Sequence, residues 1–513
     1  MAAKANKVAL ATTSQLAADA AAEIADLGGN AADCGIAAAI SSINTQPGVC
    51  ALAGSAFITI WEAGRKPITI DGNVAIPGIG LPADHDPVAE VVEIEYGGGI
   101  KTLVGASSVA VPGTLAALHK ASELYGKLPW RDLLQPTIRA VRNGFPFARA
   151  CHYYLGYAGK VIYGRSDDGY RALHDENGRL RDVDNTILIP HLADSLTAIA
   201  DEGERIFYEG EIGRRIVAHV AERGGTLTID DLKNYVPEIR DSLVVTVGSW
   251  QIATNPPPAI GGAGLAAMLL SFGTEPMEAW DHASVLRLIR TQQAVMSYRQ
   301  ENIYTADDIT APVEEILELA KSQTLLSRWS SGSTVHTSSV DRNGLAFSIT
   351  ASSGYGSGEM PGNTGIWLNN CLGEIELNRS GLLAGPPGKR LPSNMAPSAL
   401  RRENCVLAIG SPGADRITTA LHQFLVNFVQ LDLDLNDAVT HSRMHLKIDD
   451  ASSNLAVEPG IDLPDIEFQI TRYPEPNMYF GGVVAALADT SGKFQAAADP
   501  RREGGTYIGP NGH

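Results

Sequence analysis

Cysteine is scarce in this chain, with five residues among 513. Their number is odd, and no two of them form a C-x-x-C pair; they are Cys34, Cys50, Cys151, Cys371 and Cys405. A disulfide framework needs an even set at short spacings, and a zinc or redox site needs paired cysteines. The sequence therefore excludes a disulfide-stapled scaffold and predicts reduced thiols in the core.

Basic residues are also few, since 40 Lys and Arg against 58 Asp and Glu give a formal net charge of −18. Nucleic acids and anionic membranes bind basic surfaces, so neither is an expected partner, and a small-molecule substrate is. No run of 18 apolar residues occurs, and polar residues from Thr12 onward interrupt the first apolar stretch too early for a signal peptide. These absences predict a soluble, cytoplasmic protein.

The chain does have enough apolar material for a large core, because 44% of its residues are hydrophobic and only 19% are charged. Helical periodicity at 14–27 and within 113–144 alternates with short β-like runs at 56–61 and 67–70, which predicts an α/β fold. Further helices are expected at 191–200 and 212–223. Another follows Gly261-Gly262, which lets it begin close to a substrate or to another element.

The chain changes character before Thr334. A charged stretch from Leu317 ends in the small run Ser330-Ser331-Gly332-Ser333. Two strand-like runs follow, 334–340 and 345–352, separated by an Asn-Gly turn that predicts a hairpin. Depending on the length of the turn, Ala351 or Ser353 lies opposite Thr334, and Ser352 is a neighbour in both cases.

Two interpretations of Thr334 are open from these residues alone. The first is a threonine-rich edge strand with no chemical role. The second is cleavage of the chain before Thr334. Cleavage would give one residue both a hydroxyl nucleophile and a free α-amine that acts as its base in acyl transfer.

Over nearly its whole length the chain resembles the gamma-glutamyltransferases, which are N-terminal nucleophile hydrolases. Each matching block is short, but their number and common order are specific. The blocks are Gly28-Gly29-Asn30-Ala31-Ala32-Asp33, Val111-Pro112-Gly113-Thr114, Leu128-Pro129-Trp130, Leu133-Leu134-Gln135-Pro136, Phe207-Tyr208-Glu209-Gly210, Gly225-Thr226-Leu227-Thr228, Pro256-Pro257-Pro258, Gly410-Ser411-Pro412-Gly413, Glu458-Pro459-Gly460 and Asp499-Pro500-Arg501-Arg502.

The resemblance implies a four-layer αββα fold and a precursor that cuts itself. The cut would fall between Ser333 and Thr334, giving a large subunit of residues 1–333 and a small subunit of residues 334–513. The two subunits would stay associated as one αββα domain. No partner other than these two subunits and a small-molecule substrate is implied.

The resemblance also assigns the catalytic residues. Thr334 falls on the nucleophile, and Ser352 falls on a threonine that hydrogen-bonds the nucleophile in the family. Gly413 and Ala414 fall on two glycines whose backbone N–H groups form the oxyanion hole. Alanine is acceptable there provided that Ala414 does not need a positive φ. His336 is retained, and we expect it to have a packing role.

The residues that would recognise a γ-glutamyl group are mostly changed. Asn73 stands where the family has an arginine for the α-carboxylate, and Ser393-Asn394 stands where it has a Ser-Ser pair. Cys371 and Glu374 fall on the positions that bind the α-amino group, and only Glu374 keeps its charge. Losing a buried charge partner costs about 2 to 5 kcal/mol. We therefore expect conserved hydrolytic machinery with a pocket altered away from γ-glutamyl.

Several activities remain open. They are an ordinary gamma-glutamyltransferase or glutathione hydrolase, an oxamate-type amidohydrolase, a cephalosporin acylase, and a carbon–carbon bond hydrolase of alkylproline antibiotic biosynthesis. A non-catalytic binding protein on this fold is the alternative from another class. Neither a cofactor nor a metal is expected. His441 with His445, and Asp84-His85-Asp86, lack an H-E-x-x-H motif or a clear third ligand, so both sets are interpreted as structural or exposed.

Overall fold

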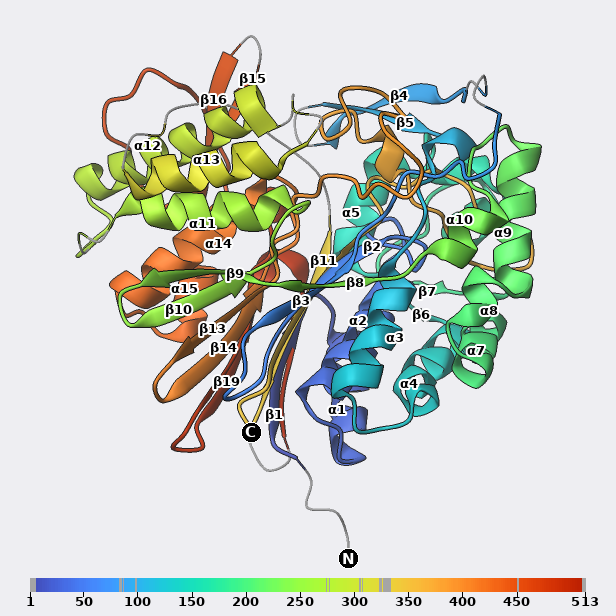
Figure 1. The fold of residues 1–513 in the computed structure, drawn as a ribbon, viewed down its shortest axis with the longest axis horizontal. Coiled ribbons are helices and arrows are strands. Elements are labelled where there is room, and N and C mark those ends of the chain that lie inside the picture. Colours follow the sequence, from blue (N-terminus) through green and yellow to red (C-terminus); the bar gives the residue numbers. More distant parts are fainter. Residues whose placement is uncertain are drawn as a thin grey trace, which may run out of the picture.

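The computed structural model describes residues 6–509 except 83–84, 86, 97–98, 274, 276, 304–305, 307, 323–324, 326–333 and 450–451. Thr334 lies within the described residues, whereas Ser333, the run 330–332 and the carboxylates Asp84 and Asp86 lie outside them. Two antiparallel β-sheets lie face to face, and helices cover the outer side of each (Figure 1). The predicted four-layer αββα fold is confirmed.

The first sheet has seven strands in the order β20-β1-β11-β12-β2-β3-β8. Their bounds are β1 Val8–Thr12, β2 Ser55–Trp61, β3 Ile68–Gly72, β8 Glu238–Asp241, β11 Val335–Asp341, β12 Ala346–Ser352 and β20 Gly505–Gly509. The second sheet has six strands in the order β19-β18-β14-β13-β10-β9. Their bounds are β9 Leu243–Val247, β10 Trp250–Thr254, β13 Ser398–Arg402, β14 Cys405–Gly410, β18 Val484–Asp489 and β19 Phe494–Ala498.

Small side chains fill the space between the two sheets. Ala9, Ala346, Ala399 and Ala408 belong to one buried cluster there, which lets the sheets approach closely. The His336 ring also lies in this layer, and a Cβ on Gly410 would come within 2.0 Å of it. Glycine at the end of β14 therefore makes room for the histidine.

Helices form the two outer layers. The first sheet is covered by α1 Gln15–Asp26, α2 Ala31–Thr45 and α3 Thr114–Tyr125, with α4 Trp130–Asn143 packed on α2, and the second by α11 Ile260–Phe272, α14 Arg416–Leu425 and α15 Leu435–Thr440. Further helices are α5 Arg149–Ala158, α6 Asp167–Leu173, α7 Leu192–Glu202, α8 Arg205–Tyr208, α9 Glu211–Glu222, α10 Ile229–Asn234, α12 His282–Tyr298 and α13 Thr310–Lys321. Small sheets pair β4 Glu90–Ile94 with β5 Ile100–Val104, β6 Phe145–Pro146 with β7 Thr186–Ile187, and β15 Met444–Asp449 with β16 Ser452–Val457 and β17 Gln469–Arg472.

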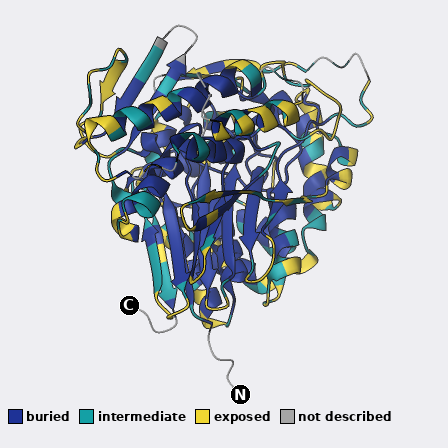
Figure 2. Ribbon diagram, turned by 60° about the vertical axis from the view of Figure 1, so that its left-hand side comes forward, coloured by how far each residue is buried: buried dark blue, intermediate teal, exposed yellow. Residues whose placement is uncertain are grey.

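Burial follows this layering, because the sheets are buried and the exposed residues lie on outer helices and loops (Figure 2). All five cysteines are free and buried, which confirms the predicted core thiols. Of the helices in the described part of the chain, none is long and apolar enough to cross a membrane.

The predicted hairpin is confirmed as β11 and β12 in the middle of the first sheet, but both predicted registers are wrong. Val335 pairs with Ala351, so continuing the register by one position places Ser352 opposite Thr334. The reason is the turn, in which Asp341 N donates to Leu345 O at 3.1 Å. The Asp341 carboxylate also accepts from Asn343 N at 2.8 Å and thereby holds a three-residue loop.

Candidate active site

A small cavity at the head of β11 is lined by all the predicted site residues of the described chain except Gly413. These are Asn73, Thr334, Ser352, Cys371, Glu374, Ser393, Asn394 and Ala414. Ser55, Val74, Leu377, Pro392 and Met395 complete the lining. Residues that are hundreds of positions apart in the sequence thus meet at one end of the sheet sandwich.

Three neighbouring strands deliver hydroxyl groups to this cavity. Thr334 immediately precedes β11 and is 3% exposed. Ser352 ends β12, and it pairs with Ser55 at the start of β2. The Ser55 hydroxyl donates to the Ser352 carbonyl at 3.1 Å. Ser55 was missed by sequence reasoning because only the pairing of β2 with β12 places it here.

The hydroxyl of Thr350 does not belong to this group. It bonds His336 Nδ1 at 2.7 Å, and Ser338 bonds His336 Nε2 at 2.9 Å. Burial lowers the pKa of His336 to about 3, so the ring is neutral at physiological pH. These contacts agree with a packing role for His336.

The turn after β14 carries Gly413 and Ala414, the two residues predicted to supply oxyanion N–H groups. Gly413 has φ +121° and Ala414 has φ +72°, so the condition stated for alanine at this position, that it need not adopt a positive φ, is not met. A left-handed conformation costs an alanine about 1 to 2 kcal/mol. Neither N–H donates to an acceptor among the described residues, so both are available to a ligand in the cavity.

The residues after Ala414 hold this turn from behind. Asp415 forms an ion pair with Arg416 at 2.6 Å and bonds His445 Nε2 at 2.9 Å. His445 Nδ1 in turn lies 3.0 Å from the hydroxyl of Thr419. Burial alone would raise the pKa of Asp415, but the charge of Arg416 and the bond to His445 hold it below its usual value. His445 is therefore a structural partner of the turn.

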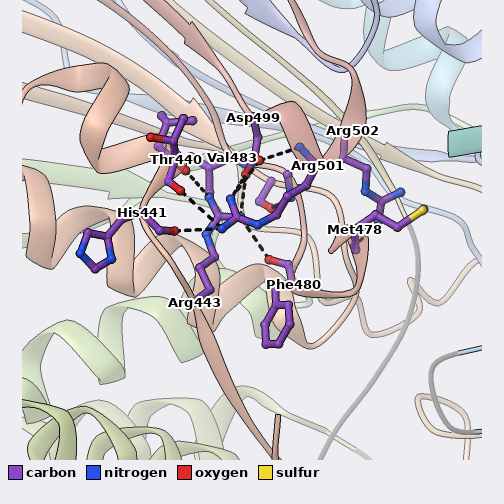
Figure 3. A network of polar contacts seen from close by, with 12 residues as sticks. Thr440, His441, Arg443, Met478, Phe480, Val483, Asp499, Arg501 and Arg502 are labelled. Atoms are coloured by element: carbon purple, nitrogen blue, oxygen red, sulfur yellow. Dashed lines mark hydrogen bonds and ion pairs between the residues drawn. The ribbon is translucent and has the colours of Figure 1, made fainter. Parts of the chain in front are cut away.

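A buried ionic cluster holds residues 477–483, which pack against the other side of the turn (Figure 3). Asp499 pairs with Arg443 at 2.7 Å and with Arg501 at 3.0 Å, and Arg501 Nε donates to Glu458 at 2.7 Å. Two arginines thus balance two carboxylates, as buried charges require. The matching blocks around Glu458 and Asp499 therefore build this cluster rather than the cavity.

The cluster reaches the turn through the backbone of residues 477–483. Asp499 accepts from Val483 N at 3.1 Å, and Arg443 donates to Phe480 O at 3.3 Å. Gly482 N donates to the Ser411 hydroxyl at 3.0 Å. A Cβ on Gly413 would lie only 2.7 Å from the Cα of Gly481, so the segment packs directly on the turn.

Glu374 lines the end of the cavity that carries the predicted amine-binding residues, and the Glu376 carboxylate lies near it. Burial raises the pKa of Glu374 well above its usual value, and the nearby Glu376 carboxylate adds to that rise. Burial also raises the pKa of Glu376 to about 7, although the hydrogen bond that Tyr355 donates to it at 2.7 Å acts to lower this pKa. The Cys371 thiol, whose pKa burial also raises, bonds Glu374.

Two arginines that sequence reasoning had not placed contact the altered positions. Arg299, fully buried after α12, donates to Asn394 Oδ1. Arg390 donates to the Asn73 carbonyl at 2.7 Å, while Asn73 Nδ2 donates to the Leu391 carbonyl. An arginine thus lies next to each of these two asparagines.

The close approach of Gly261-Gly262 is to protein backbone. A Cβ on Gly261 would lie 2.0 Å from the Asn394 carbonyl oxygen, and Gly261 N donates to Ser393 O at 3.0 Å. A Cβ on Gly262 would lie 2.0 Å from Asn255 O. The start of α11 therefore supports the segment that carries Ser393 and Asn394.

Comparison with known proteins adds three findings. A family model described as gamma-glutamyltranspeptidase matches residues 17–509. The glutathione hydrolase proenzyme of Pseudomonas aeruginosa is 28% identical over 97% of this chain and 93% of its own length, and acylase ACY 1 proenzyme of Pseudomonas sp. strain SE83 is 29% identical over 84% and 81%. The crystal structure of cephalosporin acylase from Bacillus halodurans shares the fold, with a TM-score of 0.78 at 23% identity over 99% of this chain and 97% of that one.

Proposed function

The chain belongs to the gamma-glutamyltranspeptidase family of N-terminal nucleophile hydrolases and transferases, and we propose that it cuts itself before Thr334 and then hydrolyses or transfers an acyl group other than γ-glutamyl. One observation carries this proposal. Thr334, Ser352 and Ala414 line the same cavity as the altered specificity residues Asn73 and Asn394. This shared lining supports a site in which Thr334 is the nucleophile, Ala414 is an oxyanion donor and the specificity residues are changed.

The proposed reaction proceeds through an acyl-enzyme. The α-amine freed by cleavage takes the proton from Thr334 Oγ, and Oγ attacks the carbonyl carbon of the substrate. The N–H groups of Gly413 and Ala414 stabilise the negative oxygen of the tetrahedral intermediate. The leaving group departs with a proton, and water or another acceptor then attacks the acyl-enzyme. Thr334 Oγ regains its proton in this last step.

The two proposed subunits would remain together because their strands interleave. β11 and β12 of the small subunit lie between β1 and β2 of the large one, and β20 extends the same sheet beyond β1. In the second sheet, β13 pairs with β10 across the same division. Cutting the chain before Thr334 leaves every one of these pairings intact, since it removes only the peptide bond that precedes β11.

Self-cleavage is tested by denaturing electrophoresis with N-terminal sequencing and intact mass. We expect a small chain that begins Thr334-Val335-His336 and ends with the C-terminus. Thr334→Ala should stay uncut and inactive while folded, whereas Thr337→Ala should be cut as in the wild type. Thr337 is a matched control because it lies in the same strand but bonds Thr12 instead of lining the cavity. Full activity of an uncut chain contradicts the proposal.

The altered specificity is tested with a panel of acyl donors. Wild-type protein is incubated with γ-glutamyl-p-nitroanilide, glutathione, oxamate and a series of acyl p-nitroanilides, and both turnover and acyl-enzyme mass are measured. We expect γ-glutamyl donors to be slower than the best donor by about two to three orders of magnitude, from the 2 to 5 kcal/mol estimated for the lost arginine. The mass of the trapped adduct identifies the acyl group directly.

Ordinary glutathione hydrolysis is the second candidate. The retained acidic side chain of Glu374 and the name of the Pseudomonas aeruginosa relative favour it. Glutathione turnover with kcat/KM on the order of 10⁴ M⁻¹s⁻¹ or better, a normal enzymatic efficiency, would establish this candidate and refute the altered pocket.

A further inference from the structure

The nucleophile cavity has no basic side chain among the described residues that line it, and its one acidic side chain is Glu374. Arg299 and Arg390 contact Asn394 and Asn73, but neither arginine is part of the lining. A carboxylate on the acyl group would therefore be buried here without a basic side chain to contact it, which is costly. A neutral polar group suits the part of the cavity that the two asparagines line.

The side-chain amide of Asn73 has only one possible orientation. It bonds the Leu391 carbonyl oxygen, which can only accept, so the bonded atom is Nδ2. The other end of the amide is Oδ1, and no donor among the described residues bonds it. Asn73 is 1% exposed and lines the cavity. Its Oδ1 is therefore a buried acceptor that needs a donor from a ligand.

The side-chain amide of Asn394 has the opposite orientation. The guanidinium of the fully buried Arg299 bonds it and can only donate, so the bonded atom is Oδ1. Nδ2 is the other end of this amide, and its two N–H groups can serve a protein partner and a ligand together. The positive charge of Arg299 at Oδ1 polarises the amide and strengthens Nδ2 as a donor.

Ser393 provides a second donor next to Asn394. Its Oγ accepts from Met395 N at 3.3 Å, and that bond does not use the hydroxyl hydrogen. Gly261 N donates to the Ser393 carbonyl at 3.0 Å, which fixes this segment against α11. The cavity thus offers donors from Ser393 and Asn394 and an acceptor from Asn73. A carboxylate has acceptors only, whereas a primary carboxamide has an acceptor oxygen and N–H donors.

We propose that Asn73, Ser393 and Asn394 bind a primary carboxamide of the acyl group, at the place where the family binds the α-carboxylate. The inference rests on the proposed function and names the substrate class as acyl donors with a neutral carboxamide at this distance from the scissile carbonyl. The carboxamide oxygen accepts from Ser393 Oγ and Asn394 Nδ2, and its NH₂ group donates to Asn73 Oδ1. Hydrolysis breaks the C–N bond to the leaving amine; water supplies a hydroxyl to the acyl carbon and a proton to the amine, and the carboxamide stays intact.

The test compares acyl groups that differ only in their terminal group. The substrates are the mono-p-nitroanilides of glutaric acid whose other end is a carboxamide, a free acid or a methyl ester, together with pentanoyl-p-nitroanilide. We expect kcat/KM for the carboxamide to exceed that of the acid and that of the ester at least tenfold. The acid has a charge without a basic partner, and neither the ionised acid nor the ester has a donor for Asn73 Oδ1. A preference for the acid, or equal use of all three, overturns the proposal.

Two variants test whether the preference depends on these residues. Asn394→Asp keeps a partner for Arg299 but removes the N–H donors, so it should reduce the advantage of the carboxamide over the pentanoyl substrate at least tenfold. Asn73→Leu removes the acceptor and should reduce the advantage of the carboxamide over the ester about tenfold, mainly through KM. Asn454→Asp is the matched control, because its exposed amide bonds Thr471 on the small sheet, and both ratios should stay unchanged. Unchanged ratios in both cavity variants overturn the proposal.

A binding measurement separates this proposal from the proposed function. Calorimetry compares glutaramate, the monoamide of glutaric acid, with glutarate and pentanoate on wild type and on Asn394→Asp, and self-cleavage is recorded on the same samples. Binding of glutaramate at least tenfold tighter than the other two, with this advantage lost in Asn394→Asp, supports the proposal. A self-cleaved, active enzyme that binds all three alike overturns it while the proposed function stands. An uncut, inactive chain that still prefers glutaramate overturns the proposed function alone.

Discussion

Two single variants, one that adds a methyl group at position 413 and one that removes a methyl group at position 414, test the proposed oxyanion turn. In Gly413→Ala, the new Cβ would lie 2.7 Å from the Cα and 3.2 Å from the N of Gly481. The segment that carries Gly481 is held by the buried ionic cluster, so the turn rather than the segment has to move. A displaced oxyanion donor typically costs a factor of about 10² to 10³ in kcat, or roughly 3 to 4 kcal/mol. We expect a loss of that size with little change in KM.

The reverse exchange, Ala414→Gly, should be harmless. It removes the left-handed penalty of about 1 to 2 kcal/mol and adds about 0.5 to 1 kcal/mol of backbone entropy loss on folding. The net change in the free energy of unfolding is then a stabilisation of about 0 to 1.5 kcal/mol. The backbone N–H remains in place, so kcat should stay within about twofold of the wild type.

The assay measures kcat and KM separately for each self-cleaved variant on the best p-nitroanilide of the panel, together with its thermal unfolding. Gly64→Ala is the matched control, because Gly64 has φ +74° but no atom lies within 4 Å of its added Cβ. It reports the conformational penalty without a clash and away from the cavity. A wild-type kcat in Gly413→Ala, or a tenfold lower kcat in Ala414→Gly, would refute the assignment of this turn as the oxyanion hole.

Three further changes test other parts of the site. Asn73→Arg should raise kcat/KM on γ-glutamyl-p-nitroanilide at least tenfold relative to butyryl-p-nitroanilide, because it restores a cation beside the substrate carboxylate; an equal change on both substrates would argue against this. Asp499→Asn should destabilise the protein by about 3 to 5 kcal/mol in denaturant unfolding, since it leaves the buried Arg443 without its carboxylate partner and Arg501 with Glu458 alone, whereas Asp489→Asn at an exposed turn should cost less than about 0.5 kcal/mol. Glu376 has a folded-state pKa of about 7, above the ordinary value of 4.5, so the folded state binds the extra proton between these values and stability should fall as pH rises from 4.5 through 7. Glu376→Gln should flatten that dependence by less than the full 1.4 kcal/mol per pH unit, because the side chain is partly exposed, and an unchanged slope in a pH series of unfolding curves would contradict the raised pKa.

Much of the fold was readable from local sequence. Helical periodicity predicted the first helices, and the Asn-Gly turn predicted the hairpin of β11 and β12. These features depend on residues that are neighbours along the chain, so the sequence contains them directly. The order of short matching blocks predicted the family, which the comparison confirmed. The role of Thr334 that follows from it stays a prediction.

What the sequence could not supply depends on contacts between distant segments. Ser55 entered the site only through the pairing of β2 with β12. The register of the hairpin is an exception, since it depends on a local bond between the Asp341 carboxylate and Asn343 N that the Asn-Gly pattern does not specify. The positive φ of Ala414 follows from a turn held between Asp415 and the segment at Gly481. Arg299 and Arg390 contact Asn394 and Asn73, residues far from them in the sequence. Local patterns determined which elements form, whereas the packing of the two sheets decided which side chains meet, because such contacts depend on the positions of residues hundreds apart in the chain.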